Sequence, residues 1–127
     1  MNFTHLHVHT HYTLLTALGR PEELLARAKE LGQTSLAITD TSALYGAVEF
    51  YMKAKDYGIK AIIGAEVYVA KDLTSKNNTT EDRRRNTLVL LVKNEIGYKN
   101  LLKIISIAHL DGFYYKAHTN KKLLRQY

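Results

Sequence analysis

The chain contains no cysteine and no tryptophan among its 127 residues. The absence of cysteine excludes a disulfide framework and any metal site built from thiolates. It also fits a reducing compartment, so we expect a cytoplasmic protein. Long apolar runs are missing too, because runs such as residues 88–92 are far shorter than a membrane span. The N-terminus shows no basic segment followed by an apolar stretch, so we predict neither a signal peptide nor a membrane partner.

Size and charge set further limits. With 46% hydrophobic and 24% charged residues, the composition is that of one soluble globular domain. The formal net charge of +6 favours phosphate-bearing partners such as DNA by Coulomb attraction. Solubility alone would explain the same charge, because it is spread over many lysines.

Strand and helix patterns alternate along the chain. Strands are expected at residues 3–9, 35–39, 61–63, 66–69, 88–92 and 113–115, with 88–92 covered on both faces. Helices are expected at residues 21–31, 45–57 and 97–109, and a further helix begins at residue 120. This order predicts an α/β fold in which parallel strands alternate with helices, as a sheet or a barrel.

A polar segment at residues 71–86 interrupts the alternation and ends near Arg83, Arg84 and Arg85. We expect it to form an exposed basic loop. The three adjacent arginines are a weak candidate for nucleic-acid binding, and a merely solvated surface is the alternative.

The strongest chemical feature is the run of alternating histidines at the N-terminus. On a strand, His5, His7 and His9 would project from one face, roughly 7 Å apart along the chain. Neutral imidazole is a good ligand for zinc, iron or manganese, so this face is a candidate metal site. The alternatives are a solvated edge strand that is rich in histidine, or a purification artefact.

Two carboxylates follow or interrupt apolar strands. Asp40 comes directly after residues 35–39, at the strand end where α/β folds collect their ligands. Its alternative role is to cap the next helix, a role that Thr41 or Ser42 could share. Glu66 lies among apolar residues, where a carboxylate is costly unless it is paired or bound to metal. On a strand exposed on one face it would be only a solvated side chain.

Motifs with more specificity occur in order along nearly the whole chain. They are FTHLHVHT with YTLL at residues 3–15, LAITD with LYGAVEFY at 36–51, GIKAIIGAEVY at 58–68, residues 88–93, GYKNL at 97–101 and GFYYK at 112–116. Together they resemble the polymerase-and-histidinol-phosphatase (PHP) domain of bacterial DNA polymerase III alpha subunits. The resemblance implies the first part of a seven-stranded β/α barrel, so we expect residues 1–127 to form a single partial PHP domain.

The resemblance also implies a site. By motif match, His7 and His9 correspond to the first pair of metal ligands, Glu66 to an acid that bridges metals, and Asp40 to the acid of a Thr-Asp-His motif. The implied cofactor is a divalent metal, which would be zinc, manganese or iron. We expect His7 and His9 to point to the same side, with Glu66 and Asp40 nearby.

The chain departs from the family pattern at polar positions. Thr16, Thr41 and Thr87 stand where the family has Asp, His and His, and Ala65 replaces a frequent Cys. A threonine hydroxyl is a poor ligand compared with carboxylate or imidazole.

These departures favour a structural or degenerate phosphoesterase module, of the 3′–5′ exonuclease type, within a replicative polymerase. An active phosphoesterase and a basic nucleic-acid-binding module are the alternatives. The expected partners are DNA and the rest of a polymerase polypeptide. A homodimer is also expected, because an open half-barrel would expose strand edges.

Overall fold

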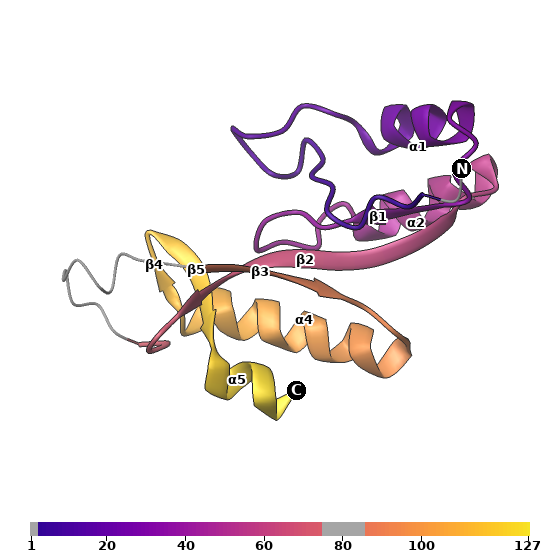
Figure 1. The fold of residues 1–127 in the computed structure, drawn as a ribbon. Helices are drawn as coiled ribbons and strands as arrows, with labels where there is room; N and C mark the ends of the chain where they lie inside the picture. Colours follow the sequence, from indigo (N-terminus) through magenta and orange to yellow (C-terminus); the bar gives the residue numbers. More distant parts are fainter. Residues whose placement is uncertain (1–2, 75–85) are drawn as a thin grey trace.

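The computed structural model of this chain describes residues 3–74 and 86–127. Its elements follow in the order α1 (Pro21–Glu30), β1 (Ser35–Ile38), α2 (Ala47–Tyr57), β2 (Lys60–Ala70), β3 (Asn86–Leu91), α4 (Glu95–Leu110), β4 (Phe113–Tyr114), β5 (Lys116–Asn120) and α5 (Lys121–Gln126) (Figure 1). Among these described helices, none has the length and apolar character needed to cross a membrane.

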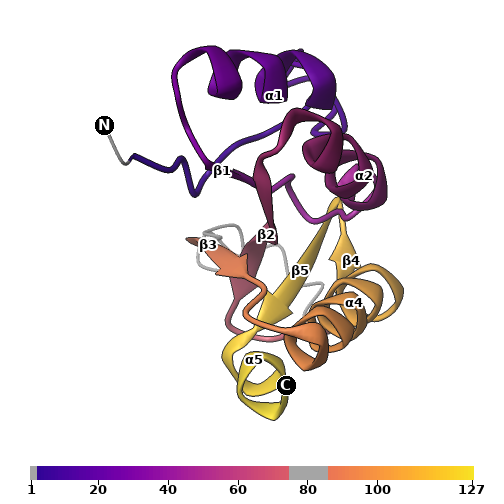
Figure 2. The same ribbon diagram turned by 90° about the vertical axis from the view of Figure 1, so that its right-hand side faces the viewer.

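The sheet is organised around β2, which is 11 residues long. The first part of β2 pairs in parallel with β1, and its later part pairs with β3 in antiparallel fashion and with β5 in parallel. β4 adds to β5 as an antiparallel neighbour. Figure 2 shows β2 passing between β3 and β5. One long strand therefore connects the N-terminal and C-terminal halves of the chain.

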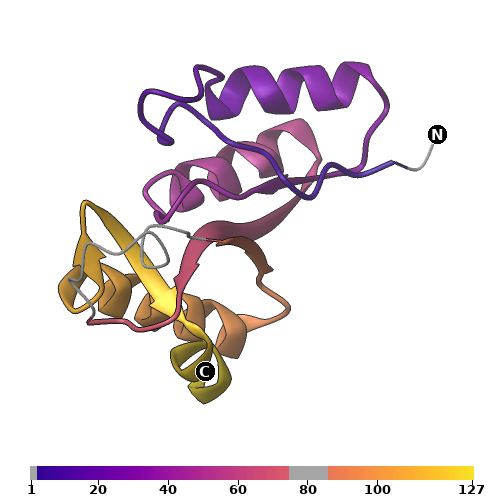
Figure 3. The ribbon, with the colours of Figure 1, turned by 60° about the vertical axis from the view of Figure 1, so that its left-hand side comes forward.

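Two apolar clusters cover the two parts of β2. The first joins α1, α2 and β1 through Leu25, Phe50 and Ile38, each at most 2% exposed. The second packs Leu101 and Ile105 of α4 against Ala65 and Val67 of β2. Figure 3 shows the same division, with α1 and α2 on one side of β2 and α4 and α5 on the other.

Gly64 lies where β2 changes from one set of partners to the other. A Cβ atom at this position would clash with the backbone carbonyl oxygen of Leu90 on β3. Glycine therefore lets β3 approach β2 closely. The sequence predicted a break at Gly64 between two strand pieces, and this was wrong, because β2 continues through it.

The N-terminal segment is extended but is not a regular strand, which corrects the prediction for residues 3–9. Its backbone still pairs with β1, since Ala37 N donates to His5 O (3.0 Å) and Thr39 N donates to Val8 O (2.8 Å). Val8 N, however, donates to the Thr39 side-chain hydroxyl at 2.8 Å. The Thr39 hydroxyl therefore accepts the bond that a backbone carbonyl would accept in a regular sheet, and the strand pattern of hydrogen bonds is interrupted.

The prediction of parallel strands is only partly correct, because the sheet is mixed. β3 and β4 both run antiparallel to their partners. The apolar run in β3 was expected to be buried on both faces, yet Leu88 and Leu91 are 43% and 41% exposed. Within the described residues β3 pairs with β2 alone, so it lies at an edge of the sheet. A closed barrel stays a prediction.

The remaining differences concern local segments. β5 was missed, since its polar sequence KAHTN lacks the apolar alternation of a strand. The expected loop at 71–86 is shorter at its end, because Asn86 already belongs to β3. Arg83, Arg84 and Arg85 lie outside the described residues, so their proposed contact with nucleic acid stays a prediction.

Candidate metal centre

Three side chains from distant parts of the sequence meet at one point. His7 and His9 come from the N-terminal segment and Glu66 from β2, and one potential ligand atom of each lies within 4.8 Å of the others. His7 Nε2 is 3.2 Å from His9 Nε2 and 2.8 Å from Glu66 Oε2. His9 Nε2 is 3.8 Å from the same carboxylate oxygen. The structure therefore brings together His7, His9 and Glu66, three of the four residues named as candidate ligands, while their binding of a metal stays a prediction.

This donor set fits a small divalent ion. Ligands about 2.05 Å from a tetrahedral zinc ion lie about 3.3 Å from one another, and the three observed separations bracket that value. Two Nε2 atoms that face each other also suit a cation, because each neutral imidazole can offer a lone pair to it. The side chains of His7 and His9 are 53% and 27% exposed, so an ion can reach them from solvent.

Asp40 lies apart from this donor set and is only 1% exposed. Its Oδ1 atom accepts hydrogen bonds from Thr10 N (2.6 Å) and from the Thr13 hydroxyl (2.7 Å). Its Oδ2 atom accepts one from the Thr10 hydroxyl (2.8 Å). The carboxylate thus holds the turn that follows the histidines. The alternative of a helix cap is wrong, because α2 begins after Gly46, while metal ligation by Asp40 stays a prediction.

A cleft of about 420 Å³ opens beside the cluster and includes His9 and Glu66 in its lining. Thr16 and Thr41, two positions where the resemblance implies stronger ligands, also line it. The Thr41 hydroxyl donates to Glu66 Oε1 at 3.4 Å, so it helps to orient the carboxylate. Thr87 lies on β3 opposite Tyr68 of β2.

Ser42 connects this cleft to the C-terminal half of the chain. Its φ of 52° is in the left-handed region, and its N–H donates to Glu66 O at 2.7 Å. His109 Nε2 of α4 donates to Ser42 O at 2.7 Å, since a carbonyl can only accept. The Ser42 hydroxyl donates to Ala117 O of β5 at 3.3 Å. Sequence reasoning missed His109, whose place in the helical pattern gave no sign of this contact.

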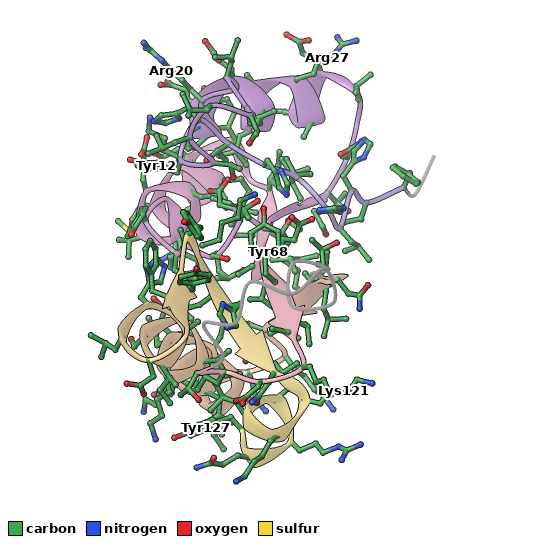
Figure 4. All side chains as sticks on the ribbon, turned by 90° about the vertical axis from the view of Figure 1, so that its left-hand side faces the viewer. Tyr12, Arg20, Arg27, Tyr68, Lys121 and Tyr127 are labelled. Carbon is green, nitrogen blue, oxygen red and sulfur yellow. The ribbon has the colours of Figure 1, made fainter. Side chains whose placement is uncertain are left out.

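A second polar network holds the same N-terminal loop to α2. The Tyr12 hydroxyl donates to Glu49 Oε2 at 2.7 Å, and Lys53 Nζ lies 3.0 Å from Glu49 Oε1. The hydrogen bond from Tyr12 and then that from Lys53 lower the pKa of Glu49. The same contacts raise the pKa of Tyr12 and of Lys53. Figure 4 shows Tyr12 within the N-terminal half and Tyr68 nearer the middle of the molecule.

Comparison with known proteins finds a matching family model and similar proteins. The PHP domain model matches residues 5–127. The chain is 45% identical over 128 residues to DNA polymerase III subunit alpha of Borreliella burgdorferi, covering 98% of this chain and 11% of that protein. It is 46% identical over 127 residues to DNA polymerase III subunit alpha of Helicobacter pylori strain J99, covering 98% of this chain and 10% of that protein. The chain thus spans about a tenth of the length of these relatives.

Solved structures share the fold. A protein from Bifidobacterium adolescentis, described as a metal-dependent phosphoesterase, superposes with a TM-score of 0.58 at 17% identity, covering 83% of this chain and 32% of that one. An amidohydrolase from Chromobacterium violaceum, with bound sulfate and no metal, gives a TM-score of 0.55 at 24% identity, covering 80% and 32%. At these identities the likeness concerns the fold alone.

The bonds of Asp40 predict a large stability effect. Replacing Asp40 by Ala removes the acceptor of the three hydrogen bonds from Thr10 and Thr13. Because a buried donor without a partner costs about 1–3 kcal/mol, we expect the free energy of unfolding to fall by about 3 kcal/mol. Urea titration measures this change. The exposed Asp56 of α2 supplies the control, and Asp56→Ala should change stability by no more than about 0.5 kcal/mol. Equal effects of the two substitutions would contradict the structural role of Asp40.

The Tyr12–Glu49–Lys53 network predicts a pH dependence of stability. Since the pKa of Glu49 is lower in the folded chain, its contribution is present above the usual value of 4.5 and is lost as pH falls through the folded value. The wild-type chain should therefore lose its stability advantage over a Glu49→Gln variant between neutral pH and the acid range. Urea midpoints of both proteins at several pH values test this, because the other carboxylates affect both alike. A difference that does not change with pH would disprove the prediction.

Proposed function

We propose that this chain, which belongs to the PHP domain family, binds one divalent metal ion at His7, His9 and Glu66 as the degenerate phosphoesterase module of a larger DNA polymerase III alpha polypeptide. The observation that supports the proposal most directly is the convergence of three ligand atoms within 4.8 Å. The similarity to DNA polymerase III alpha subunits over 98% of the chain supports the identity of the larger polypeptide.

The number of donors favours a single ion. Catalysis of phosphoryl transfer by two metals needs ions roughly 3.5–4 Å apart, each with its own charged ligands. Glu66 is the one carboxylate among the described residues that line the cleft. Thr16 and Thr41 add only neutral hydroxyls, and both oxygens of Asp40 accept bonds from threonines. The described residues thus leave a second ion without an evident anionic ligand.

The chain's own residues define what this module would do. Its metal ion, when bound, would polarise a phosphoryl oxygen and acidify a water molecule. His7 and His9 would hold the ion as neutral imidazoles, and Glu66 would neutralise part of its charge. Thr41 would keep the second oxygen of Glu66 turned toward the cleft. With three protein ligands, one position of a tetrahedral site would stay open to a ligand.

The proposed partner is the remainder of the polymerase polypeptide, because the chain corresponds to about a tenth of its relatives. DNA contact, a cytoplasmic location and a homodimer belong to the same proposal, in which the module is the degenerate form of a 3′–5′ exonuclease-type site. The exposed apolar side chains of the edge strand β3, Leu88 and Leu91, favour contact with a further polypeptide.

The proposal predicts that the chain binds about one equivalent of zinc. Removing one of three ligands by His9→Ala should weaken the affinity about 100-fold, because two ligands cannot complete the site. Competition with a zinc-sensitive dye measures the affinity. His5 supplies the matched control, since it lies on the same segment but outside the cluster. Loss of zinc binding in His5→Ala but not in His9→Ala would contradict the assignment.

The small number of charged donors in the cleft predicts at most weak phosphoesterase activity. With manganese or zinc, the purified chain should release few nucleotides from the 3′ end of an end-labelled oligonucleotide. The reason is that neutral threonines stand where the resemblance implies metal ligands. A Thr16→Asp, Thr41→His variant should release more, because it adds a carboxylate and an imidazole to the cleft. Robust release by the wild-type chain, abolished by His9→Ala, would overturn the degenerate assignment.

A further inference from the structure

Lys116 lies beside the candidate metal centre without belonging to it. β5 pairs in parallel with β2 in a register that matches His118 with Tyr68. This register places Lys116 so that its Nζ atom donates to the Tyr68 hydroxyl at 3.1 Å and lies 4.7 Å from the centre of the Tyr68 ring. The tyrosine therefore holds the flexible lysine side chain in a defined place.

Tyr68 also relates this lysine to the metal centre. Tyr68 and Glu66 are two residues apart on β2, and side chains at that spacing lie on the same face of a strand. Lys116, Tyr68, Glu66 and His9 accordingly line the same cleft of about 420 Å³. The ammonium group and the metal ligands thus face one shared space.

The charge of Lys116 is not neutralised by any ion pair found among the described residues. Its Nζ atom contacts the hydroxyl and the ring of Tyr68, both uncharged. Glu66, the carboxylate of the same cleft, is directed to His7 at 2.8 Å. Within the described part of the chain, no carboxylate is paired with this exposed ammonium group, which suits it to bind an anion.

We propose that Lys116, positioned by Tyr68, is a phosphate-binding residue that holds the phosphoryl group of a nucleotide against the metal centre. The inference rests on the proposed function for its metal ion, but the lysine itself is assigned from its own contacts. A dianionic phosphate monoester fits best, because one phosphate oxygen can face the ion while another accepts from the ammonium group. The cleft volume suits a ligand of nucleotide size.

The test is titration of thymidine 5′-monophosphate by calorimetry, at low ionic strength, with zinc-loaded and metal-free protein. Lys116→Gln should weaken nucleotide binding about tenfold, as expected for loss of one charge-assisted hydrogen bond. Lys116→Arg should stay within about threefold of wild type, because it keeps the charge. Tyr68→Phe should weaken nucleotide binding less than Lys116→Gln does, since the variant keeps the ring that contacts Lys116 and loses only the hydroxyl. Lys60→Gln is the charge-matched control, because Lys60 is exposed and lies at the first residue of β2, far along the strand from Tyr68.

Zinc affinity, measured on the same samples, separates this inference from the proposed function. Intact zinc binding with unchanged nucleotide affinity in Lys116→Gln overturns the role of Lys116 and leaves the metal site standing. If zinc-loaded wild-type protein binds no nucleotide, the role of Lys116 is likewise overturned and the metal site stands. If zinc fails to bind, the proposed function fails, and the titration of the metal-free proteins tests the lysine by itself. Weaker nucleotide binding in Lys116→Gln but not in Lys60→Gln supports the role of Lys116, and equal binding in the two variants overturns it. Replacing the nucleotide by inorganic phosphate should preserve the effect, while replacement by thymidine should abolish binding.

Discussion

The candidate site depends on the buried carboxylate of Asp40. Its side chain accepts hydrogen bonds from Thr10 and Thr13, which follow the two histidines. Its backbone carbonyl accepts from the N–H of Glu66 at 3.2 Å. One residue thus joins the segment that bears the imidazoles to the strand that bears the carboxylate. This connection matters because residues 3–9 lack the regular ladder of a strand, and the bonds between Thr39 and Val8 hold the N-terminal segment to the end of β1 without reaching Glu66.

The candidate site also depends on the length of β2. A shorter strand would pair with β1 or with β3 and β5, but it could not connect the two apolar clusters. Glu66 lies just past Gly64, where the partners of β2 change, so its side chain reaches the cleft between the two halves. Ser42 strengthens the connection, since it bonds to Glu66, His109 and Ala117. The cleft therefore depends on contacts from both halves of the chain.

Periodicity and turn residues predicted most of the elements. The helices expected at residues 21–31 and 97–109 and the strand expected at 35–39 agree with α1, the body of α4 and β1, because each has an apolar pattern of the right period. The direction of the strands was harder to predict. The apolar sequence of β3 is the same whether the strand lies antiparallel at an edge or parallel in the middle of a sheet. The polar β5 has no apolar pattern, and its pairing with β2 depends on residues 50 positions away.

The candidate site, like the fold, was predicted where neighbouring residues carry the pattern and was missed where it depends on contacts between distant residues. Alternation in the N-terminal segment was enough to place His7 and His9 on one side, and the motif match brought in Glu66. The role of Asp40 was ambiguous in the sequence, because a carboxylate at a strand end can bind a metal, cap a helix or hold a turn. Only the positions of Thr10 and Thr13 show that its oxygens accept bonds from the turn. Lys116 gave no signal of its own, since its importance comes from the register of β5 on β2.

Asp40 and Thr41 are neighbours, yet they differ in what depends on them. Asp40 is buried and satisfies three donors, so its loss affects folding before it affects chemistry. Thr41 is partly buried at the cleft, where its hydroxyl makes one long bond to Glu66. Thr16 likewise lines the cleft, outside the two apolar clusters. Positions where the resemblance implies metal ligands can therefore carry neutral hydroxyls while the fold stays intact, which explains how the two apolar clusters occur together with few candidate metal ligands.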